Sequence, residues 1–576
     1  MSSLDWIVLA ATLLLIITYG LYKSKTSKNL EGYFLSNRSM PWYLVLLSIM
    51  GTQASAITFL SAPGQAFTDG MRFVQYYFGL PLAMVVICIS FVPLFNRLKV
   101  FTAYEYLEQR FDLRTRTLTS FLFLLSRGVS TGISIYAPSI ILSSLFGWDI
   151  YFTNILMGGL LIIYTVSGGA KAVAYTQQLQ LIIIFAGLFF VGYLLVSYLP
   201  DDVGFSDALH VSGAMGKLNV ITTGVSEEGF NWKDKYNLIS GIVGGFFLAL
   251  SYFGTDQSQV GRYLTAKNNT QSKLGLLMNG IVKVPMQFAI LLLGALLFTY
   301  YQFNKGPIFH NPAVSAKVYS TSHGNKLKQL EQGYETLTLS HKQVVREYVK
   351  NKEDDALKLQ LQQGNKRLDS LRIAYKETLK EADASIDTND TNYIFLRFVV
   401  DTLPAGLVGL LIAIIFLAAW GSIAAALNSL ASCTMIDFYW RYKKQHEHPT
   451  HTDIEEARKY KLSKWMTFYW GLFCIVVAQF ANRMGSLIEA VNVLGSIFYG
   501  VILGIFLVAF YFKKIGARAI FYGALLAEAF VILFFVLDSQ GTIGLGFLWL
   551  NVMGAGLVVI FGYLLQSFQQ KAGSNA

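Results

Sequence analysis

Apolar blocks of about 18 to 25 residues recur along the chain, from Trp6 near one end to Leu565 near the other. A helix of this length crosses the hydrocarbon core of a bilayer, which is about 30 Å thick. Only 14% of the 576 residues are charged and 54% are hydrophobic, whereas roughly 25% of the residues in a soluble domain are charged. The pattern predicts an all-α polytopic membrane protein and excludes a soluble enzyme, a nucleic-acid-binding protein and a single-pass receptor.

About thirteen membrane spans follow from these blocks, with boundaries good to a few residues. They divide the chain into 1–302 with eight spans, a polar insert at 303–392, and 393–576 with five spans and a short cytoplasmic tail. The predicted spans are 6–22, 43–66, 74–96, 117–146, 150–167, 175–198, 236–254, 274–302, 404–438, 465–481, 485–512, 516–537 and 543–567.

The distribution of basic residues predicts the orientation. With the N-terminus outside, about 24 Lys and Arg residues lie in inside loops and about 5 lie in the short outside loops. The first block follows Asp5 and precedes Lys23, which reverses the charge order of a signal peptide and indicates a retained span. We therefore expect the N-terminus outside and the C-terminus inside, in the plasma (inner) membrane.

The stretch at 303–392 is polar and rich in Lys, Glu, Gln and Leu at helical spacing. It predicts a helical hairpin outside the membrane, with its turn at Gly364-Asn365. Such an insert could dock an extracytoplasmic partner or act as a lid. It could also be a solvated decoration without a direct role in chemistry.

The second span carries small and polar residues deep in the bilayer, where unpaired polar groups are costly. A helix that unwinds there frees backbone carbonyl oxygens, which are hard ligands suited to a dehydrated Na⁺. Packing of the span through its small residues is the alternative. The residues concerned are Gly51, Thr52, Gln53, Ser55 and Thr58.

The ninth span has a matching segment of small and polar residues, from Ala418 to Ser429. Ala418 and Ser422 are four residues apart, so they share one helix face. A backbone carbonyl and a hydroxyl can therefore converge on one ion.

Short motifs occur in a fixed order outside the insert. They are Ala103-Tyr-Glu-Tyr-Leu-Glu-Gln-Arg-Phe111, Gly168-Gly-Ala-Lys-Ala-Val-Ala-Tyr-Thr176, Gly254-Thr-Asp-Gln257 followed by Arg262, Leu403-Pro-Ala-Gly-Leu407, Ala426-Leu-Asn-Ser429, Asp437 and Gly495-Ser-Ile-Phe-Tyr-Gly500. In order and spacing they resemble the sodium:solute symporter family, which includes sodium/glucose, iodide, multivitamin, monocarboxylate and sialic acid carriers. The resemblance implies a LeuT-like fold, with two inverted five-helix repeats at about 43–198 and 236–512 and alternating access around a central site.

The resemblance also implies a main sodium site. Carried over by position, its ligands are the carbonyls of Gly51, Ala54 and Ala418 and the hydroxyl of Ser422. Gly421 stands where the family usually has a second serine, so the site is one hydroxyl short.

A second sodium site of some members uses an acidic residue and hydroxyls further along the ninth span. The matching positions here are Gln177, Ala424 and Ala425. We therefore expect Na⁺ as the coupling ion, bound at a single site.

The positions that hold sugar hydroxyls in the sugar-carrying relatives are Tyr77 and Ala249 here, which argues against a sugar site of that type. Tyr252 matches the aromatic gate of the family, and Lys283 matches a lysine near the substrate.

Arg127 lies about ten residues into an apolar span, where an unpaired guanidinium is very costly. Its planar fork of donors suits a substrate carboxylate, as in the sialic acid carriers that this arrangement resembles. The alternative is that Arg127 pairs with an internal acid or with backbone carbonyls. The candidate substrate-binding residues are Gln53, Ser55, Thr58, Gln75, Tyr77, Arg127, Tyr252 and Lys283.

The sequence and the resemblance together predict a secondary transporter rather than an enzyme. We expect a sodium-coupled symporter of a small organic solute, anionic and carboxylate-bearing, that works among membrane lipids. Three alternatives stay open. They are a sodium-coupled carrier of a neutral sugar or polyol, a carrier driven by protons, and a solute sensor that signals through its insert.

Overall fold

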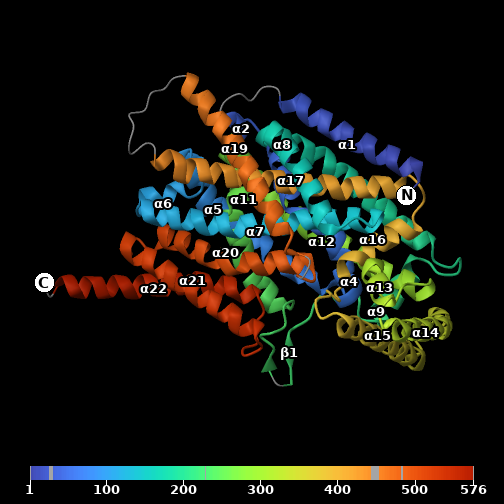
Figure 1. Cartoon of the computed structure of the whole chain (residues 1–576). Helices are drawn as coiled ribbons and strands as arrows, with labels where there is room; N and C mark the ends of the chain where they lie inside the picture. Colours follow the sequence, from blue (N-terminus) through green and yellow to red (C-terminus); the bar gives the residue numbers. More distant parts are fainter. Residues whose placement is uncertain (1, 25–29, 228, 443–452, 482–483, 575–576) are drawn as a thin grey trace.

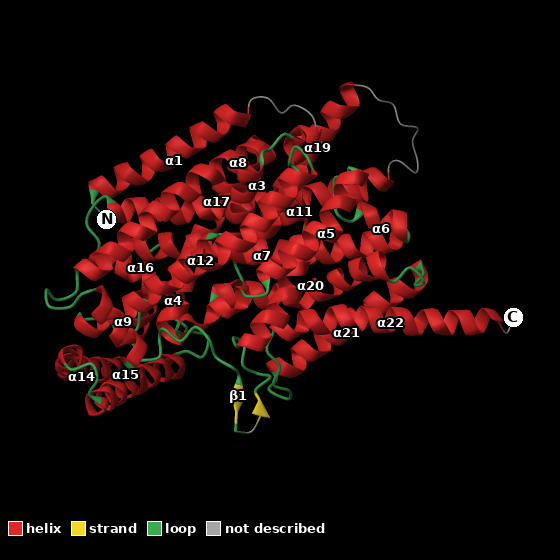
Figure 2. Cartoon of the chain, turned by 180° about the vertical axis from the view of Figure 1, so that it is seen from behind, coloured by secondary structure: helices red, strands yellow, loops and turns green. Residues whose placement is uncertain are grey.

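Helices account for nearly all the secondary structure of the computed structural model, which describes all residues except 1, 25–29, 228, 443–452, 482–483 and 575–576. The described residues contain one small sheet, a hairpin of β1 (Val225–Ser226) and β2 (Gly229–Phe230) paired antiparallel. Figure 2 shows this hairpin projecting from the helical body. The all-helical prediction is therefore confirmed.

Long helices lie side by side in the body of the molecule (Figures 1 and 2). They are α1 (Ser3–Ser24), α3 (Trp42–Gln53), α4 (Ala56–Asp69), α5 (Leu80–Leu98), α7 (Leu113–Phe146), α8 (Ile150–Ser197), α10 (Gly245–Thr255), α12 (Asn269–Phe303), α17 (Leu407–Cys433), α19 (Asp453–Ala478), α20 (Leu487–Tyr511), α21 (Ala517–Ser539) and α22 (Leu548–Ser574).

Shorter helices join these or cap their ends. They are α2 (Leu30–Leu35), η1 (Ser36–Arg38), η2 (Met71–Tyr77), α6 (Glu105–Arg110), α9 (Phe205–Ala214), η3 (Ser240–Gly244), α11 (Gln257–Tyr263), α13 (Pro312–Tyr319), α16 (Thr391–Thr402) and η4 (Thr434–Tyr439). The insert adds α14 (Gly324–Lys350) and α15 (Asp355–Ala382).

Among the described residues, 9 helical stretches are long and apolar enough to cross a membrane, or up to 10 if the bent pair of α3 and α4 is one span. Two shorter apolar helices, Ile150–Val166 and Ser240–Thr255, coincide with two further predicted spans. The predicted span at 465–481 falls on α19, which is outside those stretches. The multi-pass prediction is confirmed, and the count of thirteen stays a prediction.

The two chain ends lie at opposite ends of the helical body. Figures 1 and 2 both show the N-terminus at the same end as the insert helices α14 and α15, and the C-terminus at the other end. An odd number of crossings gives this arrangement. Which end faces outside stays a prediction.

The predicted turn of the insert at Gly364-Asn365 is wrong. The chain turns at 351–354, where Asp354 caps α15 by accepting two backbone hydrogen bonds of 2.8 and 3.1 Å. Gly364 lies inside α15, where an added Cβ would come within 2.3 Å of His341 Nδ1 on α14. The glycine therefore serves close packing of two helices rather than a turn.

α17 is buried along its length among α1, α7, α8 and α19. Its sequence is rich in alanine, with Gly421 midway, and small side chains let neighbouring backbones approach closely in a membrane. The ninth predicted span is thus the central helix of the bundle, and it carries Ala418 and Ser422 to the interior.

Candidate functional site

The second span is broken in the middle, as predicted. The axes of α3 and α4 differ by 62°. Ala54 donates its N–H to Met50 O at 2.7 Å, and Ser55 donates to Gln53 O at 3.0 Å. Because Ser55 turns to Gln53, the carbonyl of Gly51 is released from the helical ladder and can accept another partner.

The facing part of α17 presents two oxygens on one helix face. Ser422 donates its hydroxyl to the Ala418 carbonyl at 3.0 Å and to the Ala419 carbonyl at 3.1 Å. The side chain of Ser422 is buried. The Ser422 hydroxyl and the Ala418 carbonyl thus lie next to each other, and their role as ion ligands stays a prediction.

Gln177 of α8 links α3, the first half of the broken span, to α17. It accepts a hydrogen bond from Ser48 at 2.9 Å, and its amide nitrogen donates to the Gly421 carbonyl at 3.1 Å and to the Thr52 hydroxyl at 3.3 Å. A Cβ at Gly51 would lie 2.8 Å from the Gln177 side chain, so only glycine fits there. The position that is acidic in some relatives therefore holds a neutral side chain that bridges α3 and α17.

Gln180, one turn further along α8, packs against the missing serine position. Its Oε1 lies 2.7 Å from the point at which a Cβ would stand on Gly421. Its Nε2 is buried and has no hydrogen-bond partner among the described residues. Sequence reasoning missed Gln180, although its place three residues after Gln177 on a helix offered a signal.

A cavity of about 90 Å³ opens beside the break in the second span. Six of the eight candidate substrate residues line it, which are Gln53, Ser55, Thr58, Tyr77, Arg127 and Tyr252. The structure therefore brings together residues from η2, α7 and α10 with both halves of the broken span. Its other lining residues are Ile57, Tyr76, Leu248, Ile488, Val491, Asn492 and Tyr499.

Arg127 contributes the positive charge of this cavity. Its Nη1 lies 3.9 Å from Asp256 Oδ2, and its guanidinium carbon lies 5.7 Å from the centre of the Tyr252 ring. Asp256 is already engaged, because it accepts from the Tyr499 hydroxyl at 2.8 Å and from the Ser258 hydroxyl at 2.5 Å. The internal acid that we considered as an alternative partner is present, but its ion pair with Arg127 is long and leaves guanidinium donors for a ligand.

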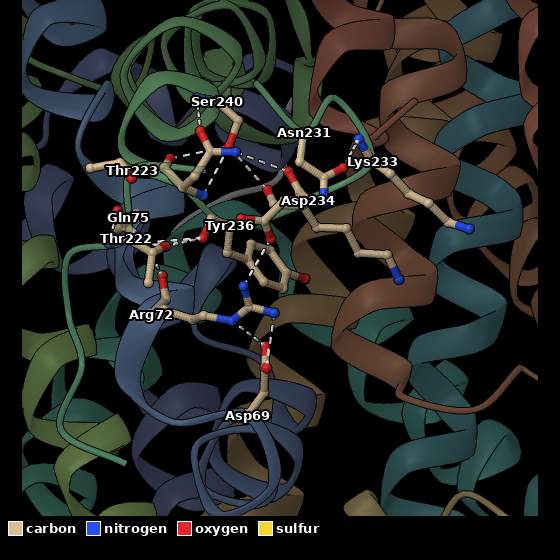
Figure 3. A network of polar contacts seen from close by, with 12 residues as sticks. Asp69, Arg72, Gln75, Thr222, Thr223, Asn231, Lys233, Asp234, Tyr236 and Ser240 are labelled. Atoms are coloured by element: carbon tan, nitrogen blue, oxygen red, sulfur yellow. Dashed lines mark hydrogen bonds and ion pairs between the residues drawn. The ribbon is translucent and has the colours of Figure 1, made fainter. Parts of the chain in front are cut away.

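Gln75 does not line the cavity. Figure 3 shows the polar contacts that it makes instead. Its amide nitrogen donates to the Thr222 hydroxyl at 3.0 Å and to the Tyr236 carbonyl at 3.1 Å, and its oxygen accepts from the Thr222 N–H at 3.1 Å. Arg72 reaches the same loop through an ion pair of 2.8 Å with Asp234. Gln75 therefore ties η2 to the loop before η3.

Lys283 lies behind the cavity rather than on its wall. It is fully buried on α12, and its Nζ lies 5.6 Å from the centre of the Tyr77 ring. Asn279 and Gln287, one turn away on either side, are buried too. The polar side-chain atoms of all three have no hydrogen-bond partner among the described residues. Sequence reasoning missed Asn279 and Gln287, although polar residues at intervals of four in an apolar span are a readable signal.

Several motif residues join neighbouring elements of the bundle. Arg116 of α7 pairs with Asp437 of η4 at 2.6 Å and with Glu108 of α6 at 2.7 Å. Gln257 of α11 accepts from the Ala103 N–H at 3.0 Å. Arg116, Glu108, Asp437 and Gln257 therefore hold elements together and do not line the cavity.

Broken helices that enclose a polar cavity inside a bundle of apolar spans define the class of secondary transporters. A model of the sodium:solute symporter family matches residues 33–325 and 373–527. The chain belongs to this family, and the resemblance seen in the sequence is confirmed.

Individual relatives agree with this membership. The chain is 25% identical over 564 residues to the sodium/sialic acid symporter SiaT of Proteus mirabilis, with 97% of this chain and 94% of SiaT covered. It is 24% identical to the sodium/sialic acid symporter NanT of Aliivibrio fischeri, with 98% and 93% covered. The sodium-dependent multivitamin transporter of Oryctolagus cuniculus is 26% identical, with 89% and 67% covered. All three are transporters by name.

A solved structure shows the same fold. It is a substrate-bound, outward-open Na⁺-coupled sialic acid symporter, with a TM-score of 0.73, 23% sequence identity and 98% of each chain covered.

Proposed function

We propose that the protein is a sodium-coupled symporter that carries a small carboxylate-bearing solute across the plasma membrane by alternating access. The observation that supports it is the position of Arg127, which lines the cavity beside the broken span and has guanidinium N–H groups available for a ligand. A guanidinium fork matches a carboxylate in geometry and charge. Two relatives are named for sialic acid, which carries a carboxylate.

Neutral groups complete the substrate site in this proposal. Ser55 and Thr58 sit at the start of α4 and can hydrogen-bond the polar atoms of the solute, and Gln53 lies across the break. Tyr77 and Tyr252 supply aromatic walls. At about 90 Å³ the cavity is below the roughly 300–1,000 Å³ of ordinary ligand sites, so a solute of few atoms fits without movement of the walls.

Two further candidates act indirectly in this proposal. Lys283, behind Tyr77, adds positive potential to the site, and Gln75 holds η2, the element that carries Tyr77. Because Lys283 lies behind the Tyr77 ring, a solute that displaces this ring could contact the Lys283 amine directly.

The proposed sodium site uses the carbonyls of Gly51, Ala54 and Ala418 and the hydroxyl of Ser422. The break in the second span supports the first pair, and the shared helix face of α17 supports the second. Gln180 Oε1 is the oxygen that replaces the missing serine hydroxyl, because it stands beside Gly421.

The surroundings of the second sodium site of some family members support a single sodium site in this protein. Ala424 and Ala425, at the positions of the hydroxyl ligands, have no side-chain oxygen of their own and pack with Val173. The amide of Gln177 is already hydrogen-bonded to α3 and to α17. A single Na⁺ moved inward through 100 mV supplies about 2.3 kcal/mol, to which the concentration ratio adds.

The topology in this proposal has thirteen spans, the N-terminus outside and the C-terminus inside, with the insert at 303–392 outside. Two inverted repeats at about 43–198 and 236–512 carry the alternating access. The extended backbone at Asp256 supports this division, because it separates α10 from α11 in the first helix of the second repeat as the break at Ala54 and Ser55 separates α3 from α4 in that of the first.

Thermal stability of the purified protein tests the proposal, because a ligand that binds only the folded state raises its apparent stability. We expect a shift with lactate or pyruvate in Na⁺ and a much smaller shift in choline. Ser422→Ala should abolish the sodium dependence. A shift with neutral sugars alone would favour the sugar carrier, and shifts that ignore Na⁺ at every pH would exclude sodium coupling.

A further inference from the structure

A second, larger cavity lies between the insert helices and the bundle of membrane-spanning helices. Its volume is about 340 Å³, and it is bounded by α14 and α15 on one side and by the outer ends of α4 and α12 on the other. Residues 326–372, which form most of the insert wall, lie outside the match to the family model. We call this cavity the outer pocket.

Cationic side chains converge on the outer pocket. Lys217, Arg372 and Lys376 line it, against one lining carboxylate, Asp369. Arg372 and Lys376 also pair with the buried Asp390, at 3.1 and 2.7 Å. Burial raises the pKa of Asp390, but Arg372, His310 and Lys376 outweigh it and hold the pKa well below its usual value. The three cations and two carboxylates leave an excess of one positive charge.

Lys217 is the cation with the most capacity for a ligand. It donates to the Thr68 carbonyl at 2.6 Å and lies 4.9 Å from the centre of the Phe298 ring. An ammonium group has three donors, so two stay available for an anion. No carboxylate lies within salt-bridge distance of Lys217 among the described residues.

The remaining walls suit a carbon skeleton. Phe67, Phe298, Tyr301 and Tyr334 line the pocket, and Tyr301 and Phe67 are packed edge to face. His341 is a buried polar wall residue that bonds through Nε2 to Gln302 Oε1 at 2.9 Å. The pocket volume falls within the roughly 300–1,000 Å³ of ordinary ligand sites.

We propose that the outer pocket is a binding site for an organic anion, with the carboxylate on Lys217 and Arg372 and the carbon skeleton against the aromatic wall. It is distinct from the central cavity, and its occupation does not require Na⁺. Thr68 and Phe67 belong to the outer end of α4, whose other end carries Ser55 and Thr58. A bound anion therefore joins the insert to α4, the second half of the broken span.

Binding to the full-length protein in detergent tests this site. The probes are gluconate and benzoate, their neutral counterparts glucose and benzyl alcohol, and inorganic phosphate, all in choline buffer without Na⁺. We expect gluconate or benzoate to raise the melting temperature while the neutral compounds do not. Equal shifts with the neutral compounds would overturn the anion site, and a shift with phosphate alone would overturn its organic part.

Two variants locate the binding. Lys217→Gln removes the free cation, and Thr338→Trp fills the pocket without changing charge. Each should weaken binding by about tenfold or more, as expected for a lost charge-assisted hydrogen bond or a blocked site. Lys366→Gln, on the exposed face of α15, is the matched control and should bind as the parent does. Binding that survives both pocket variants would refute the proposal.

The sodium requirement separates this site from the proposed transport site. The shift at the outer pocket persists in choline and in Arg127→Gln, whereas the shift at the central cavity is lost in both. Loss of the sodium-dependent shift alone would count against the proposed function and leave the outer pocket standing.

Discussion

Gln180 Oε1 lies 2.7 Å from the place where the Cβ of residue 421 would be if Gly421 had a side chain. The glutamine thus occupies the space that a serine at 421 would need. The Gln180 oxygen comes from a neighbouring helix, so the surroundings of Gly421 offer a side-chain oxygen although residue 421 itself has none.

Exchange of these two residues tests the sodium ligand set. Gln180→Ala should weaken sodium affinity by about tenfold or more, because one charge-assisted ligand oxygen is lost. Gly421→Ser alone should lower stability, since its side chain meets Gln180. The double variant Gln180→Ala, Gly421→Ser should recover sodium affinity. The measurement is the sodium dependence of the thermal shift, and a double variant no better than Gln180→Ala would exclude Gln180 as the replacement ligand.

Arg127 is tested by separating its charge from its shape. Arg127→Lys keeps the charge but loses the planar fork, and Arg127→Gln loses both. We expect the KM for a carboxylate solute to rise about tenfold in Arg127→Lys and about a hundredfold in Arg127→Gln. The sodium-induced thermal shift is the control for folding and should persist in both. A carrier of neutral sugars would show little change in KM in either variant.

Lys283 is a buried amine without a hydrogen-bond partner among the described residues. A polar group buried without a partner costs roughly 1–3 kcal/mol, so Lys283→Met should raise the free energy of unfolding by about that amount. Solute uptake should fall in the same variant if the ammonium contributes to the site. Lys366→Met, exposed on the insert, is the surface control and should leave stability unchanged. A Lys283→Met variant with a lower free energy of unfolding than the parent would contradict this prediction, because it would show that the surroundings stabilise the lysine.

The fold was predictable from the sequence because the bilayer imposes a length on every span. Blocks of bilayer length identified most of the long helices, and small polar residues around Gly51 located the break in the second span. The sequence predicts two spans at 150–167 and 175–198, whereas the structure has a single helix of 48 residues over both, α8. Helical periodicity cannot show where a helix leaves the membrane.

The site was predictable only where a residue acts through its own side chain. Arg127 stood out because a charge in an apolar span needs a reason. Gln75 did not line the cavity, because its partners Thr222 and Tyr236 come from a distant loop whose position no local pattern reveals. The predicted turn at Gly364 was wrong for the same reason, because this glycine makes room for His341 on the neighbouring helix.

His341 gives the insert a pH dependence of defined sign. Burial lowers the pKa of His341 to about 4, whereas an exposed histidine titrates near about 6.5. Between these values the unfolded insert binds more protons than the folded one. The contribution of His341 to stability is therefore fully present above about pH 6.5 and is lost as the pH falls towards 4.

Hydrogen exchange of α14 and α15 measures this loss. After correction for the intrinsic rate, we expect faster exchange at pH 5 than at pH 7.5 in the parent protein. His341→Gln keeps a polar partner for Gln302 but does not titrate, so its exchange should be the same at both pH values. His210→Gln, exposed on α9, is the control and should behave as the parent does. An insert whose exchange quickens equally in His341→Gln would place the titrating group elsewhere.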